Sequence, residues 1–145
     1  YHRLLDLAYL FTYGRLYRRL ESNLALAIGS YRQISDVWGR LNGGVFVACD
    51  PIPPLVEKRI TTTDASSEPT FIPAVTALEL GIDEINGSIT SFRDACSNPS
   101  FVLTREYIAA QLAALSDAYR ELLLTASLID PLQVRNPLLN QSGGG

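Results

Sequence analysis

Methionine is absent from this chain of 145 residues, and histidine and cysteine are scarce, with one and two copies. The only histidine, His2, lies at the very start, so a nucleophile elsewhere has no histidine base to activate it. The two cysteines match neither a C-x-x-C motif nor a Cys/His zinc spacing, and no glycine-rich loop has the strand–loop–helix context of a phosphate site. The sequence therefore predicts no catalytic residues, no metal and no cofactor, and we expect that the protein is not an enzyme.

Charged residues are also few: they make up 19% of the chain, against about 25% in a typical globular protein, while apolar residues make up 47%. Such a chain has less charged surface than a free monomer normally carries, so we expect a protein partner or a homo-oligomer. The net charge of −3 argues against nucleic acid as a partner, because nucleic-acid binders usually carry a basic excess. No run approaches 18 consecutive apolar residues, so we expect no transmembrane segment in the visible chain.

Three stretches carry apolar residues spaced alternately three and four positions apart. The first contains Leu10, Tyr13, Tyr17, Leu20, Leu24, Ala27, Tyr31, Ile34, Trp38 and Leu41; the second Val75, Leu78, Ile82, Ile85, Ile89, Phe92 and Cys96; the third Ile108, Leu112, Leu115, Tyr119, Leu122 and Ala126. This spacing places each set on one face of a helix and is typical of helices packed along their length. We predict an all-α fold, a bundle of three long helices at about residues 1–42, 71–96 and 104–128.

The segment between the first two helices has a different character. Residues 43–70 contain a short apolar run at Val45-Phe46-Val47, three prolines between positions 51 and 54, and a polar, turn-prone stretch. We therefore predict a long irregular crossover that is held down or bound, since ordered loops of this length rarely lack a role. Asp130-Pro131 is expected to stop the third helix and to leave an extended C-terminal tail. One domain over residues 1–142 and the start of a glycine linker at 143–145 complete the expected organisation. Because the chain begins at Tyr1 inside a helical pattern, we also expect a processed chain or a part of a longer one.

The two cysteines, Cys49 and Cys96, allow two interpretations. They are either two buried free thiols or one disulfide formed in an oxidising compartment, and the Ser/Thr/Pro character of the segment between them favours the disulfide. This interpretation predicts an extracellular or periplasmic protein. It also predicts topology, because Cys96 can reach Cys49 easily only if the crossover carries the chain back along the first helix. The second helix should then run parallel to the first, and the third should return antiparallel.

Three further clusters are interpreted as structural. Glu79, Asp83 and Glu84 could in principle perform acid–base chemistry or bind a hard cation, but they lie off the apolar stripe and are better explained as a solvated face. Arginines 15, 18 and 19, near two tyrosines, suit a solvated face or ion pairs within the chain. Trp38, Tyr31 and Tyr119 lie on the stripes and are expected to pack in the core, with their polar ends reaching a partner.

The first helix begins with apolar residues on more than one face. We expect contacts with another chain there and at the apolar tail, through the residues Leu4, Leu7, Phe11, Leu138 and Leu139. The sequence thus favours a noncatalytic structural or protein–protein interaction module of an exported or extracellular assembly. The alternative is an extracytoplasmic ligand-sensing helical bundle. Polar groups facing inward at one level of the bundle would favour the sensor, and continuous apolar layers would favour the interaction module.

Overall fold

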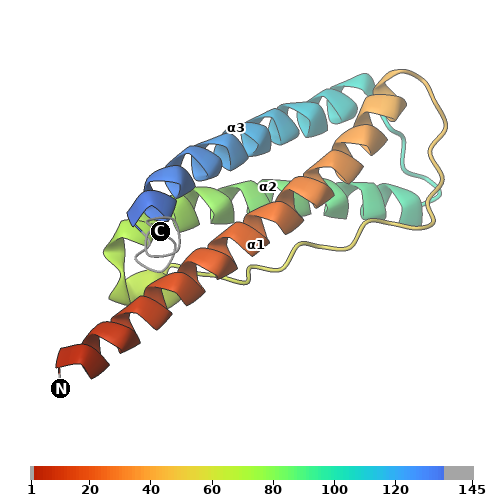
Figure 1. Cartoon of the computed structure of the whole chain (residues 1–145). Coiled ribbons are helices and arrows are strands. Elements are labelled where there is room, and N and C mark those ends of the chain that lie inside the picture. The colour runs from red at the N-terminus through yellow and green to blue at the C-terminus, as the bar shows by residue number, and fades with distance from the viewer. Residues whose placement is uncertain (1, 136–145) are drawn as a thin grey trace.

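The computed structural model describes residues 2–135, with the side chains of residues 9 and 11–132 (Figure 1). Over this range the chain forms three long helices, α1 (His2–Asn42), α2 (Ile72–Ser97) and α3 (Arg105–Arg135). Two short 3₁₀ turns, η1 (Asp64–Ser67) and η2 (Pro69–Phe71), lie at the end of the crossover. The predicted all-α bundle with a long irregular crossover is confirmed.

The first helix follows its apolar stripe closely. Its stripe residues from Tyr13 to Trp38 are buried except for Tyr31, which is partly exposed, and the helix continues through Gly29 without a break. It ends where the sequence predicts: Gly44 adopts a φ of +75°, and the amide of Val45 donates to the carbonyl of Arg40 at 2.9 Å. A residue without a Cβ adopts this left-handed conformation at little cost, so Gly44 closes the helix.

The direction of each helix follows from side-chain contacts along α1. Near its start, the ring of Tyr13 lies 4.9 Å from that of Phe71, and near its end Trp38 lies 6.1 Å from Phe92. The second helix therefore runs parallel to the first. The hydroxyl of Tyr13 donates to the carbonyl of Leu132 at 2.9 Å, so α3 returns antiparallel. Both directions agree with the predicted topology.

The crossover runs back beside α2 and past α1, as Figure 1 shows, and side chains of both helices bind its backbone. It contributes Val56 and Ile60 to the buried core. Asn23 of α1 holds it by donating to the carbonyl of Glu57 at 2.9 Å and by accepting from the amides of Arg59 and Ile60 at 2.8 and 3.3 Å. The prediction that this segment is held down is confirmed. Hydrogen bonds between helix side chains and the backbone of the crossover hold it in place.

Asn86 holds the crossover from the side of α2. Its side chain accepts from the amide of Val56 at 2.7 Å and donates to the carbonyl of the same residue at 3.0 Å. Near the far end of the crossover, the Cα atoms of Cys49 and Cys96 lie 5.7 Å apart, and the two sulfurs are within disulfide distance. The segment is thus fixed to both neighbouring helices.

The expected end of the third helix at about residue 128 is wrong, since α3 continues to Arg135 with Pro131 inside it. A proline in a helix loses one backbone hydrogen bond. Here Ile129 and Leu132, on either side of it, are buried, and the carbonyl of Leu132 accepts the Tyr13 hydroxyl. Burial of two large apolar side chains, worth about 1.5–3 kcal/mol each, offsets the lost bond. The remainder of the predicted tail, with Leu138 and Leu139, lies outside the described residues.

The start of each later helix was also predicted. Thr104 caps α3, because its hydroxyl accepts from the amide of Tyr107 at 3.0 Å, and this cap agrees with the predicted start near residue 104. The second helix begins at Ile72, one residue after the predicted start, and it has no side-chain cap, since Thr70 lies inside η2. The ring of Phe71, which is buried against Tyr13, fixes the start of α2 where no capping side chain is present.

Candidate interaction surface

An apolar groove lies open between α1 and α3, on the surface of the bundle. It has a volume of about 270 Å³. Its lining residues come from two facing helices and are Ile28, Tyr31, Arg32, Tyr119, Leu122, Leu123 and Ala126. The four residues from α3 are spaced i, i+3, i+4 and i+7, which is the pattern of a second apolar stripe beside the buried one. This groove is the strongest candidate for a functional site that the described residues contain.

The α1–α3 groove differs from the space between α1 and α2. There the chain packs its own crossover, which is bound by Asn23 and Asn86. Between α1 and α3 nothing among residues 2–135 fills the space, and Tyr119 and Leu123 remain 49% and 51% exposed. Large apolar side chains left half in water at one place mark an interaction surface more often than they mark ordinary surface.

The walls of the groove are aromatic and its rim is cationic. The rings of Tyr31 and Tyr119 lie 5.8 Å apart, tilted by 32°. Arg32, on the rim, is exposed and forms no ion pair within the part of the chain that the structure describes. Arg120, the nearest cation along α3, is already paired with Asp117. An apolar surface beside a free guanidinium suits a ligand that has an apolar face and a carboxylate next to that face.

Sequence reasoning missed this surface because it placed Tyr119 in the core. The buried stripe of α3 contains Leu115, Ala118, Leu122, Thr125, Ile129 and Leu132. It shares two leucines with the predicted stripe but replaces Tyr119 by Ala118. One signal was available: in the run Leu122-Leu123-Leu124, a single stripe can bury only one leucine, so the other two had to face elsewhere.

Of the predicted contact residues, Phe11 is 65% exposed on α1. Leu4 and Leu7 lie in the same helix, but their side chains are outside the described set, as are Leu138 and Leu139 entirely. In Figure 1 the start of α1 projects beyond the start of α2. Contacts through these residues therefore stay a prediction.

The interpretation of the acidic cluster on α2 as a solvated face holds for Asp83, which is exposed, but it is wrong for Glu79 and Glu84, which are partly buried. Glu79 accepts from the amide of Thr62 at 3.0 Å, and Asp83 pairs with Lys58 at 2.7 Å, so both hold the crossover. Glu84 instead packs toward α3, where its Oε2 is buried without a hydrogen-bond partner in the described chain. Two of the carboxylates thus hold the crossover, the third faces α3, and the three do not form a shared site.

Burial raises the pKa of Glu84, and the negative charges of Asp117, Glu121 and Asp83 raise it further, while Arg120 acts in the opposite direction. The folded protein therefore binds this proton more tightly than the unfolded chain does. The free energy of unfolding should fall as pH rises from 4.5, the ordinary value for glutamate, through the raised pKa.

We expect the Glu84→Gln variant to be more stable than the wild type at pH 7, because it cannot acquire the buried charge. The advantage should shrink as pH falls toward the ordinary glutamate pKa, where the wild-type carboxyl is protonated. Urea unfolding followed by circular dichroism at several pH values measures this difference. Glu106→Gln, an exposed position, is the control and should show no such trend; a parallel trend in both variants would contradict the assignment.

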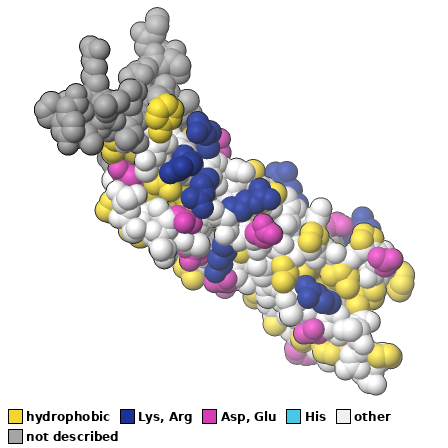
Figure 2. Space-filling model, turned by 90° about the horizontal axis from the view of Figure 1, so that it is seen from below, with side chains coloured by type: hydrophobic (Ala, Val, Ile, Leu, Met, Phe, Trp, Pro, Cys, Tyr) yellow, Lys and Arg dark blue, Asp and Glu magenta, His cyan; other side chains and the backbone are white. Residues whose placement is uncertain are grey.

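The arginine cluster behaves as expected for ion pairs within the chain. Arg19 donates to the carboxylate of Asp64 at 3.0 Å and to the carbonyl of Arg59 at 2.6 Å, while Arg15 and Arg18 are exposed. Figure 2 shows basic side chains gathered over the half of the molecule near the grey residues. Tyr17 is buried beside them, and its burial, together with the carboxylate of Glu21, raises its pKa to about 12.

Within residues 2–135, no group of three or more His, Cys, Asp or Glu side chains is arranged to hold a metal ion. The helices found there are also too short or too polar to cross a bilayer. The buried polar side chains of the described core are Asn23, Ser88 and Thr125. Asn23 holds the crossover, and Thr125 donates to the carbonyl of Glu121 at 2.8 Å. The Ser88 hydroxyl is buried without a partner in the described chain, but Ser88 lies beside Trp38, at another level of the bundle from Asn23, so the three do not form one inward-facing layer.

Comparison of the chain with protein-family models, with curated proteins and with solved structures finds no match. Function must therefore be argued from the surfaces described above.

Proposed function

We propose that this chain is a noncatalytic protein–protein interaction module of an exported or extracellular assembly, and that it binds an amphipathic helix of a partner protein in the α1–α3 groove. The observation that carries the proposal is the groove, which has an apolar floor, tyrosine walls and an unpaired arginine on its rim. Two antiparallel helices with an open groove are a common receptor for a further helix, which completes a four-helix arrangement.

The chemistry of the partner follows from the lining. Apolar side chains spaced three and four apart on the partner would fill the space between Ile28 and Leu123. A glutamate or aspartate beside them would pair with Arg32, whose charge is otherwise unmatched in the described chain. The bound helix would cover the exposed parts of Tyr119 and Leu123 and so reduce the apolar area left in water.

Two observations support the wider context of the proposal. The cysteines at disulfide distance are compatible with an oxidising compartment, as exported and extracellular proteins meet. The inward faces of the helices are mainly apolar layers, with no polar level facing a cavity among the described residues. The layers favour an interaction module over a ligand-sensing bundle.

The experiment uses a synthetic helical peptide of about 20 residues, with leucine at the a and d positions and glutamate at the flanking positions. Fluorescence anisotropy of the labelled peptide measures its affinity for the chain. Leu123→Lys should weaken binding by at least tenfold, about 1.4 kcal/mol, because it places a charge on the apolar lining. Leu80→Lys, at a leucine of α2 that is 49% exposed, should leave the affinity unchanged.

Failure of the wild type to bind the peptide, or equal losses in the two variants, would contradict the proposal. Sedimentation velocity without peptide identifies another occupant. Self-association that Leu123→Lys abolishes and Leu80→Lys preserves would assign the groove to a second copy of the chain and overturn the proposed partner.

A further inference from the structure

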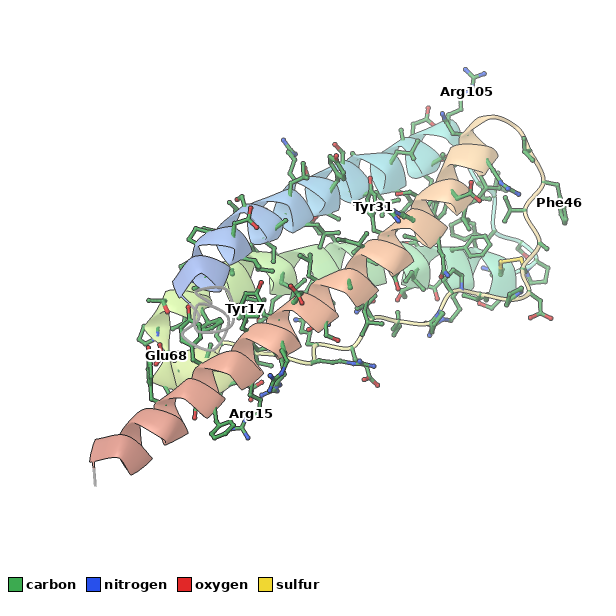
Figure 3. The ribbon with its side chains drawn as sticks, viewed as in Figure 1. Arg15, Tyr17, Tyr31, Phe46, Glu68 and Arg105 are labelled. Atoms are coloured by element: carbon green, nitrogen blue, oxygen red, sulfur yellow. A yellow bond between two sulfur atoms is a disulfide. The ribbon has the colours of Figure 1, made fainter. Side chains whose placement is uncertain are left out.

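The end of the bundle that carries Cys49 and Cys96 exposes apolar side chains on two adjacent loops. Phe46 is 87% exposed on the loop that follows α1, and Val102 is 74% exposed on the loop that precedes α3. Figure 3 shows Phe46 pointing away from the molecule at this end. In Figure 2 hydrophobic side chains gather at the end opposite the grey residues. These two residues form what we call the apolar knob.

A hollow lies directly beside the knob, with a volume of about 690 Å³. Its lining comes from the same two loops and the helices that they join, and includes Leu41, Gly43, Gly44, Leu103, Arg105 and Ile108. Among the lining residues, Gly44 lies two positions before Phe46, and Leu103 directly follows Val102. Knob and hollow are therefore neighbours on one face of the molecule. The hollow is several times larger than a phenyl ring.

Charges of both signs accompany the knob and the hollow. Arg105 lines the hollow, and Figure 3 shows its side chain extending outward. Asp50 is exposed on the loop of the knob, four residues after Phe46. Neither forms an ion pair within residues 2–135. Arg93, Asp94 and Glu106 add further charge of both signs near this end.

We infer that this end binds a second copy of the chain in a twofold, end-to-end dimer. In a twofold interface each contact occurs twice, so one surface must carry both halves of every contact. The knob would enter the hollow of the other copy, and Asp50 would pair with the other copy's Arg105, each contact being made in both directions. The mixed charges favour a protein surface over an anionic membrane, which would need a cationic rim.

The size of the end face sets the strength of the dimer. Three helices, each about 10 Å in diameter, present an end face that buries a few hundred Å² per copy, below the roughly 800 Å² per partner of a stable interface. The dimer is therefore weak and concentration-dependent. This inference goes beyond the proposed function, since the hollow lies at the end of α1 and the start of α3 and shares no lining residue with the α1–α3 groove.

Sedimentation velocity on the whole chain, from about 10 μM to about 1 mM, tests the dimer. The average mass should rise with concentration toward that of two chains. Phe46→Asp should weaken dimerisation about 30-fold, as for a central contact residue, while Leu80→Asp, at a half-exposed leucine of α2, should have no effect. Far-UV circular dichroism and a thiol titration establish that both variants keep the fold and the cysteine pair.

A charge exchange gives the more specific readout. Asp50→Arg and Arg105→Asp should each weaken the dimer about tenfold, and the double variant should restore it to within about threefold of the wild type. A mass that stays at one chain throughout, or a dimer unaffected by Phe46→Asp, would overturn the inference. So would binding of the monomer to phosphatidylcholine vesicles through Phe46, which would assign the knob to lipid. Leu123→Lys, which alters the α1–α3 groove, should leave the dimer intact. A failure of the dimer inference can therefore be distinguished from a failure of the groove proposal.

Discussion

Loss of the Cys49–Cys96 bridge should lower the free energy of unfolding by about 4 kcal/mol. The two residues are 47 positions apart. In the chain-entropy model, closing a loop of that length lowers the entropy of the unfolded state by an amount that is equivalent to about 4 kcal/mol of free energy. Residues 50–70 of the crossover and nearly all of α2 lie inside this loop. A loss of this size is a large fraction of the 5–15 kcal/mol that stabilises a typical domain.

Urea unfolding of the Cys49→Ser/Cys96→Ser variant against the oxidised wild type measures the effect. Unfolding of the wild type with excess reductant should give the same loss, because Cys49 is exposed and accessible to a small thiol. A thiol titration of the denatured, unreduced chain should find no free thiol. Two free thiols, or identical stability of the bridged and unbridged chains, would contradict the pairing.

Asn23→Ala should cost about 3 kcal/mol of stability. Asn23 is fully buried and makes three hydrogen bonds to the crossover backbone, with the carbonyl of Glu57 and the amides of Arg59 and Ile60. The alanine variant leaves those backbone groups without their partner, and an unsatisfied buried group costs about 1–3 kcal/mol. Water that enters the cavity would limit the loss.

Hydrogen exchange gives a local readout of this variant. The amides of Arg59 and Ile60 should lose protection, while amides in the middle of α2 should change only by the global loss of stability. Gln33→Ala, an exposed change on the same helix, is the control and should alter stability by no more than about 0.5 kcal/mol. Equal effects of the two substitutions would show that Asn23 does not hold the crossover.

Local pattern was sufficient to predict the first helix and the general architecture. The stripe of α1 runs from Tyr13 to Trp38 with alternate spacings of three and four, and Asn42-Gly43-Gly44 ends it. Cys49 and Cys96 then limit the direction of the second helix, because a bridge between them requires a parallel arrangement. These inferences depend on periodicity, on glycine and on chain length, which are all readable from the sequence.

The register of α3 could not be predicted in the same way, because two alternating registers share Leu115 and Leu122. The structure buries Ala118 and exposes Tyr119. The reason lies on the partner helix: Gly81 of α2 approaches α3 so closely that a Cβ there would lie 3.2 Å from Leu122 and 3.6 Å from the carbonyl of Ala118. A tyrosine in place of Ala118 would not fit between two helices that lie this close. The distance between the helices depends on tertiary packing, which the local sequence pattern does not show.

The role of Asn23 was equally hidden. It lies between Leu20 and Leu24, within the buried face of α1, but its hydrogen-bond partners are 34–37 residues away in the crossover. A polar residue beside an apolar stripe signals that some partner exists, but its identity depends on the path of the crossover. The open α1–α3 groove was missed for a related reason, since exposure of Tyr119 follows from the register.

The proposal of a helix-binding groove is tested most directly by the charge preference of that groove. The measurement is the ratio of affinities for two synthetic helices that differ only in glutamate or lysine at the flanking positions, for the wild type and for Arg32→Glu. The wild type should bind the glutamate helix about tenfold more tightly, and Arg32→Glu should reverse the preference, because a single rim charge is exchanged. Equal affinities for both helices, or a preference that Arg32→Glu leaves unchanged, would contradict the assignment of the groove to an acidic amphipathic helix.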